Sequence, residues 1–246
     1  MRKSTTFSAL CCAAMVFVSC DKNNEPANGH EYVDLGLSVK WATCNIGAFA
    51  PDRCGNYYAW GETSTKENYD WNTYKHCTYY WHEDKTGDDW EGWWYETITK
   101  YNTNGVFGKV DNKITLETAD DAAAKNWGGA WRIPTQDEWQ ELIDNCYWEW
   151  TDDYNGKGVA GNIVTSKSNG NSIFFPITGY YDENELRCTD DGGFYWSSSL
   201  DTEYYPENAV CFYIENDYLD GVRDNGIVWR SRSLRHCGLP IRPVLR

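Results

Sequence analysis

The clearest hydrophobic pattern in the chain begins after Thr135. Apolar residues recur there at the i, i+3, i+4 and i+7 spacing of one helix face: Trp139, Leu142, Ile143 and Cys146. Thr135 precedes this pattern and Glu138 follows Thr135 by three residues, which is the spacing of a capping box at a helix start. The pattern predicts a capped helix of about three turns, whose apolar face packs into one core with the C-terminal strands.

A second, shorter helix is predicted at residues 118–126. We expect Thr118 to be its N-cap, because a threonine hydroxyl can accept a hydrogen bond from the first free backbone N–H groups. Asp120 and Asp121 complement the positive end of a helix, and the three alanines at 122–124 favour helix formation.

The remaining apolar residues fall in short runs separated by Gly, Asn and Pro, a pattern typical of strands and turns. Two short strands are expected within residues 31–46 and one at 57–60. After the helix that follows Thr135, further apolar runs are candidate strands: residues 146–151, 163–165, 173–176, 195–198, 209–214, 227–229 and 241–245. Two helices followed by a β-rich second half predict an α+β fold.

Residues 62–116 follow neither the helical nor the strand period. They are rich in tryptophan: Trp71, Trp81, Trp90, Trp93 and Trp94. We interpret this segment as a long, ordered, aromatic-rich insertion with short strands. Its rings would form either a private core or a platform for a ligand, and the sequence leaves both possibilities open.

Composition narrows the choice of partners. The chain has 246 residues, with 37 Asp and Glu against 22 Lys and Arg, and a net charge of −15. Because no Lys/Arg-rich block occurs, nucleic acid is not an expected partner. Aromatic residues make up 16% of the chain, which suits a packed fold or a stacking surface and not a disordered segment.

The N-terminus has the pattern of an export signal. Arg2 and Lys3 precede an apolar run at residues 7–18 that is too short to span a membrane. Ser19-Cys20 then resembles the cleavage site of a bacterial lipoprotein, which makes Cys20 the lipidated residue. The alternative is an ordinary signal peptide cleaved nearby.

The lipoprotein prediction divides the chain into a signal peptide (1–20), a polar tether (21–30) and one domain (31–246). It places the protein in the cell envelope, attached to the membrane by its lipid, and we expect that membrane to be the outer one. An odd number of cysteines then remains: Cys44, Cys54, Cys77, Cys146, Cys188, Cys211 and Cys237. At least one is therefore free or paired between chains, and without a CxxC motif a zinc ribbon is not expected.

Characteristic motifs occur in order across the domain: residues 32–48 (YVDLGLSVKWATCNIGA), 58–62 (YAWGE), 120–123 (DDAA), 129–139 (GAWRIPTQDEW), 169–176 (NGNSIFFP), 195–199 (YWSSS) and 241–244 (IRPV). Together they resemble the Fibrobacter succinogenes major paralogous domain family, which is typical of secreted lipoproteins of Bacteroidetes. The resemblance implies a C-type-lectin-like fold, shared with formylglycine-generating enzymes, and no established activity. No segment matches the catalytic cysteine motif of those enzymes.

Members of this family also serve as the variable proteins of diversity-generating retroelements, in which adenines of a C-terminal cassette are mutagenised. The resemblance implies a fixed scaffold at residues 195–199, Gly238 and 241–244, with a variable run at 229–237 (WRSRSLRHC) between them. The alternative is a plain basic strand and loop.

The sequence offers little support for catalysis. His236 adjoins Cys237, but adjacent side chains in a strand point to opposite faces, so a dyad is not expected. His76, Cys77 and His82 lack an evident third and fourth metal ligand. Acidic residues are abundant, yet no spacing singles out a glycosidase pair. We therefore expect a binding protein and not an enzyme.

No cofactor is expected either. Oxygen ligands at Glu215, Asn216, Asp217 and Asp220 would suit Ca²⁺, but a solvated acidic loop explains them equally. The calcium-dependent lectins of this fold use a Glu-Pro-Asn motif, whereas this chain has the order Pro206-Glu207-Asn208. Stacking of sugars on exposed aromatic rings, without calcium, remains open.

The predicted binding site lies in the C-terminal third: Tyr195, Trp229, Arg230, Arg232, Leu234 and His236. If the run from 229 is extended, its alternate residues from Arg230 to His236 share one face. That mixture of cationic and apolar groups is typical of protein recognition and favours an acidic partner. The alternative is that these arginines pair within the chain with acidic residues such as Glu215, Asp217 or Asp224.

The predicted function is thus a ligand-binding or display module at the cell surface, attached to the membrane through Cys20, with a protein or glycan ligand. Two other classes stay open: a protein that binds or hydrolyses envelope glycans, and an adhesive or structural surface subunit.

Overall fold

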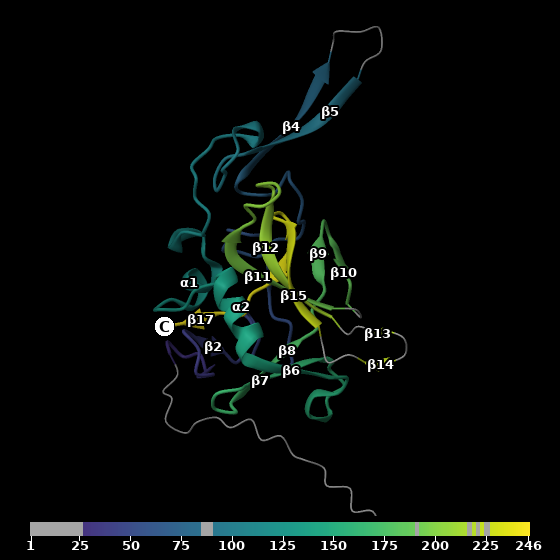
Figure 1. Cartoon of the computed structure of the whole chain (residues 1–246). Helices are drawn as coiled ribbons and strands as arrows, with labels where there is room; N and C mark the ends of the chain where they lie inside the picture. The colour runs from purple at the N-terminus through teal and green to yellow at the C-terminus, as the bar shows by residue number, and fades with distance from the viewer. Residues whose placement is uncertain (1–26, 85–90, 190–191, 216–217, 220–221, 224–226) are drawn as a thin grey trace, which may run out of the picture.

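A computed structural model describes residues 27–84, 91–189, 192–215, 218–219, 222–223 and 227–246. The predicted signal peptide and Cys20 lie outside these residues, as does most of the predicted tether. The described chain is rich in short strands and has few helices (Figure 1). This mixed, strand-rich structure is compatible with the predicted α+β class. No helix in the described part of the chain is long and apolar enough to cross a membrane.

Helix α2 (Gln136–Asn145) begins where the sequence predicts. The Thr135 side chain accepts from the Glu138 backbone N–H at 3.3 Å, and the Glu138 carboxylate accepts from the Thr135 N–H at 2.9 Å, so the capping box is complete. Trp139 and Leu142 are fully buried. Cys146, expected on the same helix face, instead begins the following strand, although it is buried in the same core cluster.

Helix α1 (Ala122–Trp127) is shorter than predicted, and Thr118 is not its N-cap. Asp121 has an extended backbone, and its carboxylate accepts from Ala124 N–H at 3.0 Å and from Ile133 N–H at 2.9 Å. A buried aspartate that also anchors the chain near Ile133 therefore sets the helix start. The structure also contains three single-turn 3₁₀ helices: η1 (Gly105–Phe107), η2 (Thr118–Asp120) and η3 (Tyr154–Gly156).

The early strands pair with the last ones. Strands β1 (Tyr32–Val33), β2 (Lys40–Ala42) and β17 (Val244–Leu245) form one antiparallel sheet in the order β1-β2-β17. Strand β3 (Tyr57–Tyr58) pairs with β16 (Leu239–Pro240). The expected strands at 31–46 and 57–60 are thus confirmed, whereas the expected run at 241–245 is a strand only in its last part.

A central antiparallel sheet consists of β11 (Gly192–Leu200), β12 (Asn208–Glu215) and β15 (Ile227–Leu234), with β12 in the middle. Helix α2 packs against this sheet, where the Trp139 ring stacks on Phe212 with 5.0 Å between centroids. The predicted shared core of Trp139 and Leu142 with the C-terminal strands is therefore confirmed, and Ile143 packs against it while half-buried.

Another antiparallel sheet follows α2 and contains β6 (Cys146–Thr151), β7 (Gly161–Ser166) and β8 (Ser172–Pro176), all near their predicted positions. The hairpin of β9 (Tyr180–Asp182) with β10 (Glu185–Arg187) was not expected from the sequence, and neither were β13 (Tyr218–Leu219) and β14 (Val222–Arg223).

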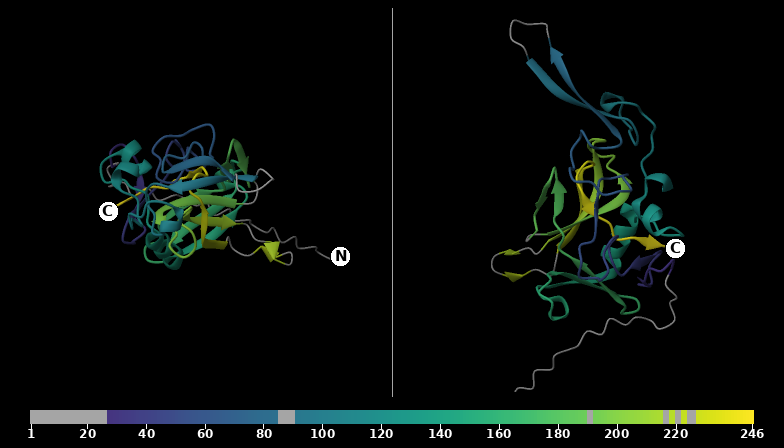
Figure 2. Two further views of the ribbon diagram at one scale, coloured as in Figure 1. Left: turned by 90° about the horizontal axis from the view of Figure 1, so that it is seen from above. Right: turned by 180° about the vertical axis from the view of Figure 1, so that it is seen from behind.

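The predicted insertion contains the longest hairpin of the described chain. Strands β4 (Cys77–Asp84) and β5 (Glu91–Ile98) pair over eight residues each and project away from the body of the molecule (Figures 1 and 2). The expectation of short strands there was wrong. A projecting hairpin need not alternate apolar and polar residues, because neither of its faces is covered by the core.

Two arginines are fully buried within this fold, Arg235 and Arg242. Arg242 donates to the Asn45 side chain at 2.7 Å, to the Ala42 carbonyl at 3.2 Å and to the Phe174 carbonyl at 3.0 Å. It thereby joins the N-terminal loop, the end of the chain and β8. All seven cysteines of the described residues are free thiols.

Candidate functional site

Strand β15 is the outer strand of the central sheet and exposes most of the predicted site. Trp229 and Leu234 are 39% and 42% exposed, and Arg230 and Arg232 also face solvent. Arg230, Arg232 and Leu234 alternate along the strand and share one face, as expected. Trp229 points to the other face, where its ring contacts Tyr213 at 5.3 Å between centroids.

The connection between β11 and β12, residues 201–207, packs beside this strand. Arg230 pairs with Glu203 at 3.0 Å and approaches the Asp201 carboxylate at 3.8 Å. The Arg232 guanidinium lies over the Tyr204 ring, 3.6 Å from its centroid. Arg232 forms no ion pair with a carboxylate in the described part of the chain.

The alternative that these arginines pair internally therefore holds for Arg230, and among the described residues its partners are Asp201 and Glu203. For Arg232 the described residues show no such pair. Asp217 and Asp224 lie outside the described residues, as do Asn216 and Asp220 of the possible calcium loop.

Tyr195 does not belong to this surface. It is fully buried, its hydroxyl donates to the Pro176 carbonyl at 2.7 Å, and its ring packs against Trp139 and Phe175. Burial raises the pKa of its phenol. The β11 position under helix α2 makes Tyr195 a core residue, so the expectation that it contacts a ligand was wrong.

His236 is also removed from the predicted face, because β15 ends at Leu234. The Cys237 N–H donates to the Leu234 carbonyl at 3.0 Å, which turns the chain inward. Gly238 follows against the Tyr69 ring, where a Cβ atom would stand only 2.7 Å from a ring carbon. His236 is left 6% exposed, its ring edge-on to Trp71 with 4.7 Å between centroids.

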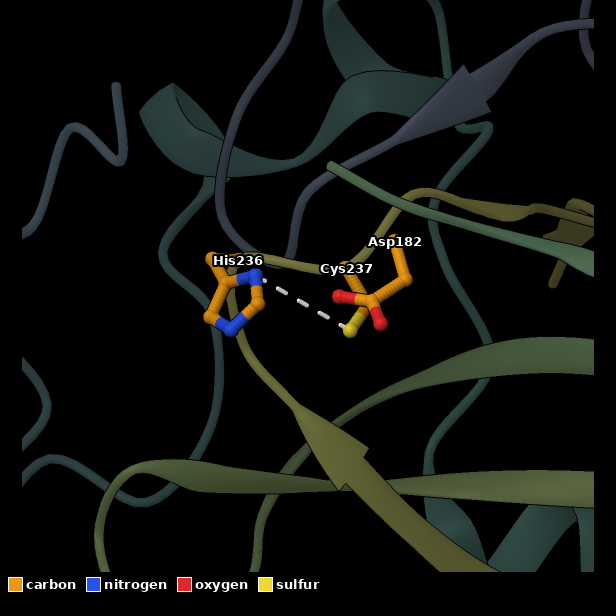
Figure 3. Close-up of side chains that lie close together, drawn as sticks. All are labelled: Asp182, His236 and Cys237. Atoms are coloured by element: carbon orange, nitrogen blue, oxygen red, sulfur yellow. Dashed lines mark hydrogen bonds between the residues drawn. The ribbon is translucent and has the colours of Figure 1, made fainter. Parts of the chain in front are cut away.

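The turn gathers a cluster that the sequence reasoning did not foresee: Asp182, His236 and Cys237, whose ligand-type atoms lie within 4.8 Å of one another (Figure 3). Figure 3 shows His236 Nδ1 facing the Cys237 sulfur, 3.9 Å away. The argument from opposite strand faces does not apply here, because the strand has already ended.

The protonation states and hydrogen bonds of these three residues fit packing in a buried turn and do not favour metal binding. Burial raises the pKa of the Cys237 thiol to about 12 and lowers the pKa of His236, so both are neutral at pH 7. His236 Nδ1 lies 2.9 Å from the Tyr69 carbonyl and must carry the proton to donate to it. A metal ion would have to break that bond and ionise a buried thiol, and Asp182 is already paired with Arg187 at 3.3 Å.

The other metal candidates are not brought together in the described chain. His76 is buried, with Nε2 3.1 Å from the Gly61 carbonyl and 3.7 Å from the Asp120 carboxylate. Cys77 begins β4, and the side chain of His82 lies outside the described residues.

Arg235, which the sequence did not single out, holds the neighbourhood of the site together. Its guanidinium donates to the Tyr74 hydroxyl at 2.8 Å and to three backbone carbonyls, those of Tyr101 at 3.2 Å, Pro206 at 3.0 Å and Lys100 at 2.9 Å. The bond to Pro206 fixes the 201–207 connection, and the others fix the insertion. Arg235 therefore positions both segments that flank the end of β15.

A pocket of about 340 Å³ opens at that end. Its lining comes from five separate segments of the chain: Trp71, Glu96, Phe107, Tyr205, Glu207, Asn208 and Leu234. Phe107 and Tyr205 meet edge to face with 5.7 Å between centroids. Burial raises the pKa of Glu207, and the Glu96 carboxylate adds to that rise. Of these residues, only Leu234 was a predicted site residue.

Some rings of the aromatic insertion are buried and others line the pocket. Tyr69 and Tyr74 form a small buried cluster with Ala59, whereas Tyr101 belongs to the larger core cluster. Trp71 and Phe107 line the pocket.

Comparison with known proteins adds no relative, because the chain matches no family model, no curated protein and no solved structure. The family resemblance therefore rests on its sequence motifs.

Proposed function

We propose that this chain is a non-enzymatic binding protein of the cell envelope, built on a C-type-lectin-like fold and held at the outer membrane by a lipid on Cys20. The ordered motifs from residue 32 to residue 244 support this fold, and the strand-rich α+β architecture is compatible with it. The export signal and Ser19-Cys20 support the anchor.

The observation that carries the proposal is the exposed outer face of β15. Arg230, Arg232 and Leu234 stand in a row beside Tyr204 and Tyr205, which are 55% and 57% exposed. Arginine and tyrosine are the residues that contribute most at protein interfaces. Because Arg230 is already paired with Glu203, Arg232 is the group that faces an acidic partner.

Of the proposed variable run at 229–237, only the part up to Leu234 is suited to variation. Trp229, Arg230, Arg232 and Leu234 are exposed, so substitutions there disturb little packing, whereas Arg235, His236 and Cys237 are buried. A reverse transcriptase gene in the neighbouring DNA, with a near-copy of the region encoding 195–244 that differs at adenines, would support hypervariability. Absence of both would contradict it.

Binding is tested by titrating the purified mature chain with acidic peptides and with envelope glycans. We expect saturable peptide binding that weakens in an Arg232→Ala/Leu234→Ala variant and stays unchanged in Lys113→Ala, which removes an exposed charge elsewhere. Peptide binding unaffected by the double variant would contradict the site. Release of glycan products would contradict the non-enzymatic function.

Membrane attachment is tested separately with Cys20→Ser. We expect this variant to leave the membrane fraction. If it fractionates with membranes as the wild type does, the anchor is not a lipid on Cys20.

A glycan ligand is the second candidate, supported by the rings of Trp71, Phe107 and Tyr205, which line one pocket. Saturable glycan binding without products, in the same titration, would favour it over a protein ligand.

A further inference from the structure

The pocket at the end of β15 combines two kinds of wall. The rings of Trp71, Phe107 and Tyr205 supply aromatic surface, and Glu96 and Glu207 supply carboxylates. The volume of about 340 Å³ falls in the range of small-molecule sites.

Neither carboxylate of the pocket has a direct counter-ion among the described residues. Neither Glu96 nor Glu207 forms an ion pair with a lysine, arginine or histidine in the described chain, although other partly buried carboxylates do, such as Glu138 with Arg132. Glu207 is partly buried and repelled by Glu96. The guanidinium of Arg235 acts on Glu207 at longer range, but its N–H groups are used by carbonyls and by Tyr74. The described residues therefore give the pocket negative charge that no direct ion pair neutralises.

The walls are held in place before any ligand arrives. Trp71 is fixed between Tyr74, at 5.6 Å between ring centroids, and His236, at 4.7 Å. The Glu207 carbonyl accepts from the Arg235 N–H at 2.9 Å. Preorganised walls reduce the entropy that binding must overcome.

We propose that this pocket binds an alkylammonium group, either a quaternary ammonium head or the side chain of a lysine. The faces of aromatic rings attract such cations, and the attraction grows where water is displaced. An alkylammonium ion would neutralise Glu96 and Glu207, while its alkyl part contacts Leu234. A neutral sugar would leave both carboxylates without a direct counter-ion. A Ca²⁺ ion takes about six to eight oxygen ligands, whereas the side chains of the pocket that carry oxygen ligands are Glu96, Glu207 and Asn208, with the Tyr205 phenol, among mostly aromatic and aliphatic walls.

This site differs from the proposed interface, because only Tyr205 and Leu234 are common to both and Arg232 does not line the pocket. If acidic peptides do not bind at β15, the ammonium site is not contradicted. If ammonium probes do not bind in the pocket, the proposed interface is not contradicted.

The experiment is a calorimetric or NMR titration of the mature chain with choline, with Nα-acetyl-lysine methylamide, and with 3,3-dimethylbutanol, the neutral isostere of choline. We expect at least one ammonium probe to saturate at millimolar concentration, and the isostere to bind about tenfold more weakly or not at all. The relative affinities of the two cations distinguish a quaternary head from a lysine.

Variants connect the signal to the pocket. Glu96→Gln/Glu207→Gln should weaken binding about tenfold or more, while Glu31→Gln/Glu149→Gln, which removes the same charge from exposed positions elsewhere, should not. Circular dichroism checks that each variant is folded, and Trp71→Phe, which keeps a ring, provides a second variant should the first fail to fold. No saturation by either cation, equal binding of the isostere, binding of neutral glycans alone, or full retention in the Glu96/Glu207 variant would each overturn the proposal.

Discussion

Arg232 and Arg235 stand three residues apart in one basic run, and the fold treats them in opposite ways. Arg232 lies on the outer face of β15, over the Tyr204 ring, and forms no ion pair in the described part of the chain. Arg235 is fully buried and its N–H groups donate to Tyr74 and to the three backbone carbonyls. The difference shows that an arginine of this run is exposed or buried according to whether it lies before or after the end of β15, and not according to its residue type.

The substitution with the largest expected effect on stability is Arg235→Leu. It leaves a buried hydroxyl and the carbonyls of Lys100, Tyr101 and Pro206 without their donor, so we expect a loss of about 3–5 kcal/mol of unfolding free energy. Urea unfolding of the mature chain measures it. A loss below about 1 kcal/mol would mean that water or neighbouring groups replace the guanidinium.

The same comparison can be made with leucines. Leu142 is fully buried in the core cluster of Trp139, whereas Leu234 is 42% exposed. Leu142→Ala should cost about 2–5 kcal/mol through lost burial and a cavity. Leu234→Ala is the matched control and should cost less than about 0.5 kcal/mol. Similar losses in the two variants would contradict the assignment of one leucine to the core and the other to the surface.

Buried histidines extend the comparison to pH. Burial lowers the pKa of His76 from 6.5 to about 4, against the opposing effect of Asp120. As the pH falls from 6.5 towards 4, the unfolded chain binds a proton that the folded chain does not, so stability decreases, by about 1–3 kcal/mol.

Unfolding curves between pH 7 and pH 4 measure this loss, and His76→Gln should flatten it. The part that remains in the variant belongs to His30 and His236, whose pKa values are also lowered by burial, and near pH 4 to carboxylates whose pKa values are lowered, such as Glu138 beside Arg132. An unchanged slope in the variant would show that His76 is protonated as readily in the folded chain as in the unfolded one.

The smallest effect is expected for Arg232→Ala. Its guanidinium contacts only an exposed ring, so unfolding free energy should change by less than about 0.5 kcal/mol while peptide binding weakens. A loss as large as that of Arg235→Leu would show that the outer face of β15 is structural and would remove it as a binding surface.

Local signals were sufficient for part of the fold. The capping box of Thr135 and Glu138 lies within four residues, and β12 follows from a continuous apolar run, whose residues Ala209 to Phe212 are all buried. The β4–β5 hairpin gave no such signal, since it projects from the body and no core imposes a period on it.

The site was predictable only where it follows one strand. Alternation identified Arg230, Arg232 and Leu234, but extending the same period to His236 failed at the turn after Leu234. The pocket could not be predicted, because Trp71, Glu96 and Glu207 meet through tertiary packing across long stretches of sequence.

The pairing of β2 with β17 has a consequence for when the protein can fold. Arg242 donates to Asn45 and Ala42 across separations of 197 and 200 residues, and β17 completes the sheet that β2 begins. Contacts with such separations form late and slowly, because a long loop must close before they contribute any stability. A chain synthesised from its N-terminus therefore cannot complete this sheet until residues 244–245 have left the ribosome, so the first strands wait for their partner through most of the synthesis of the domain.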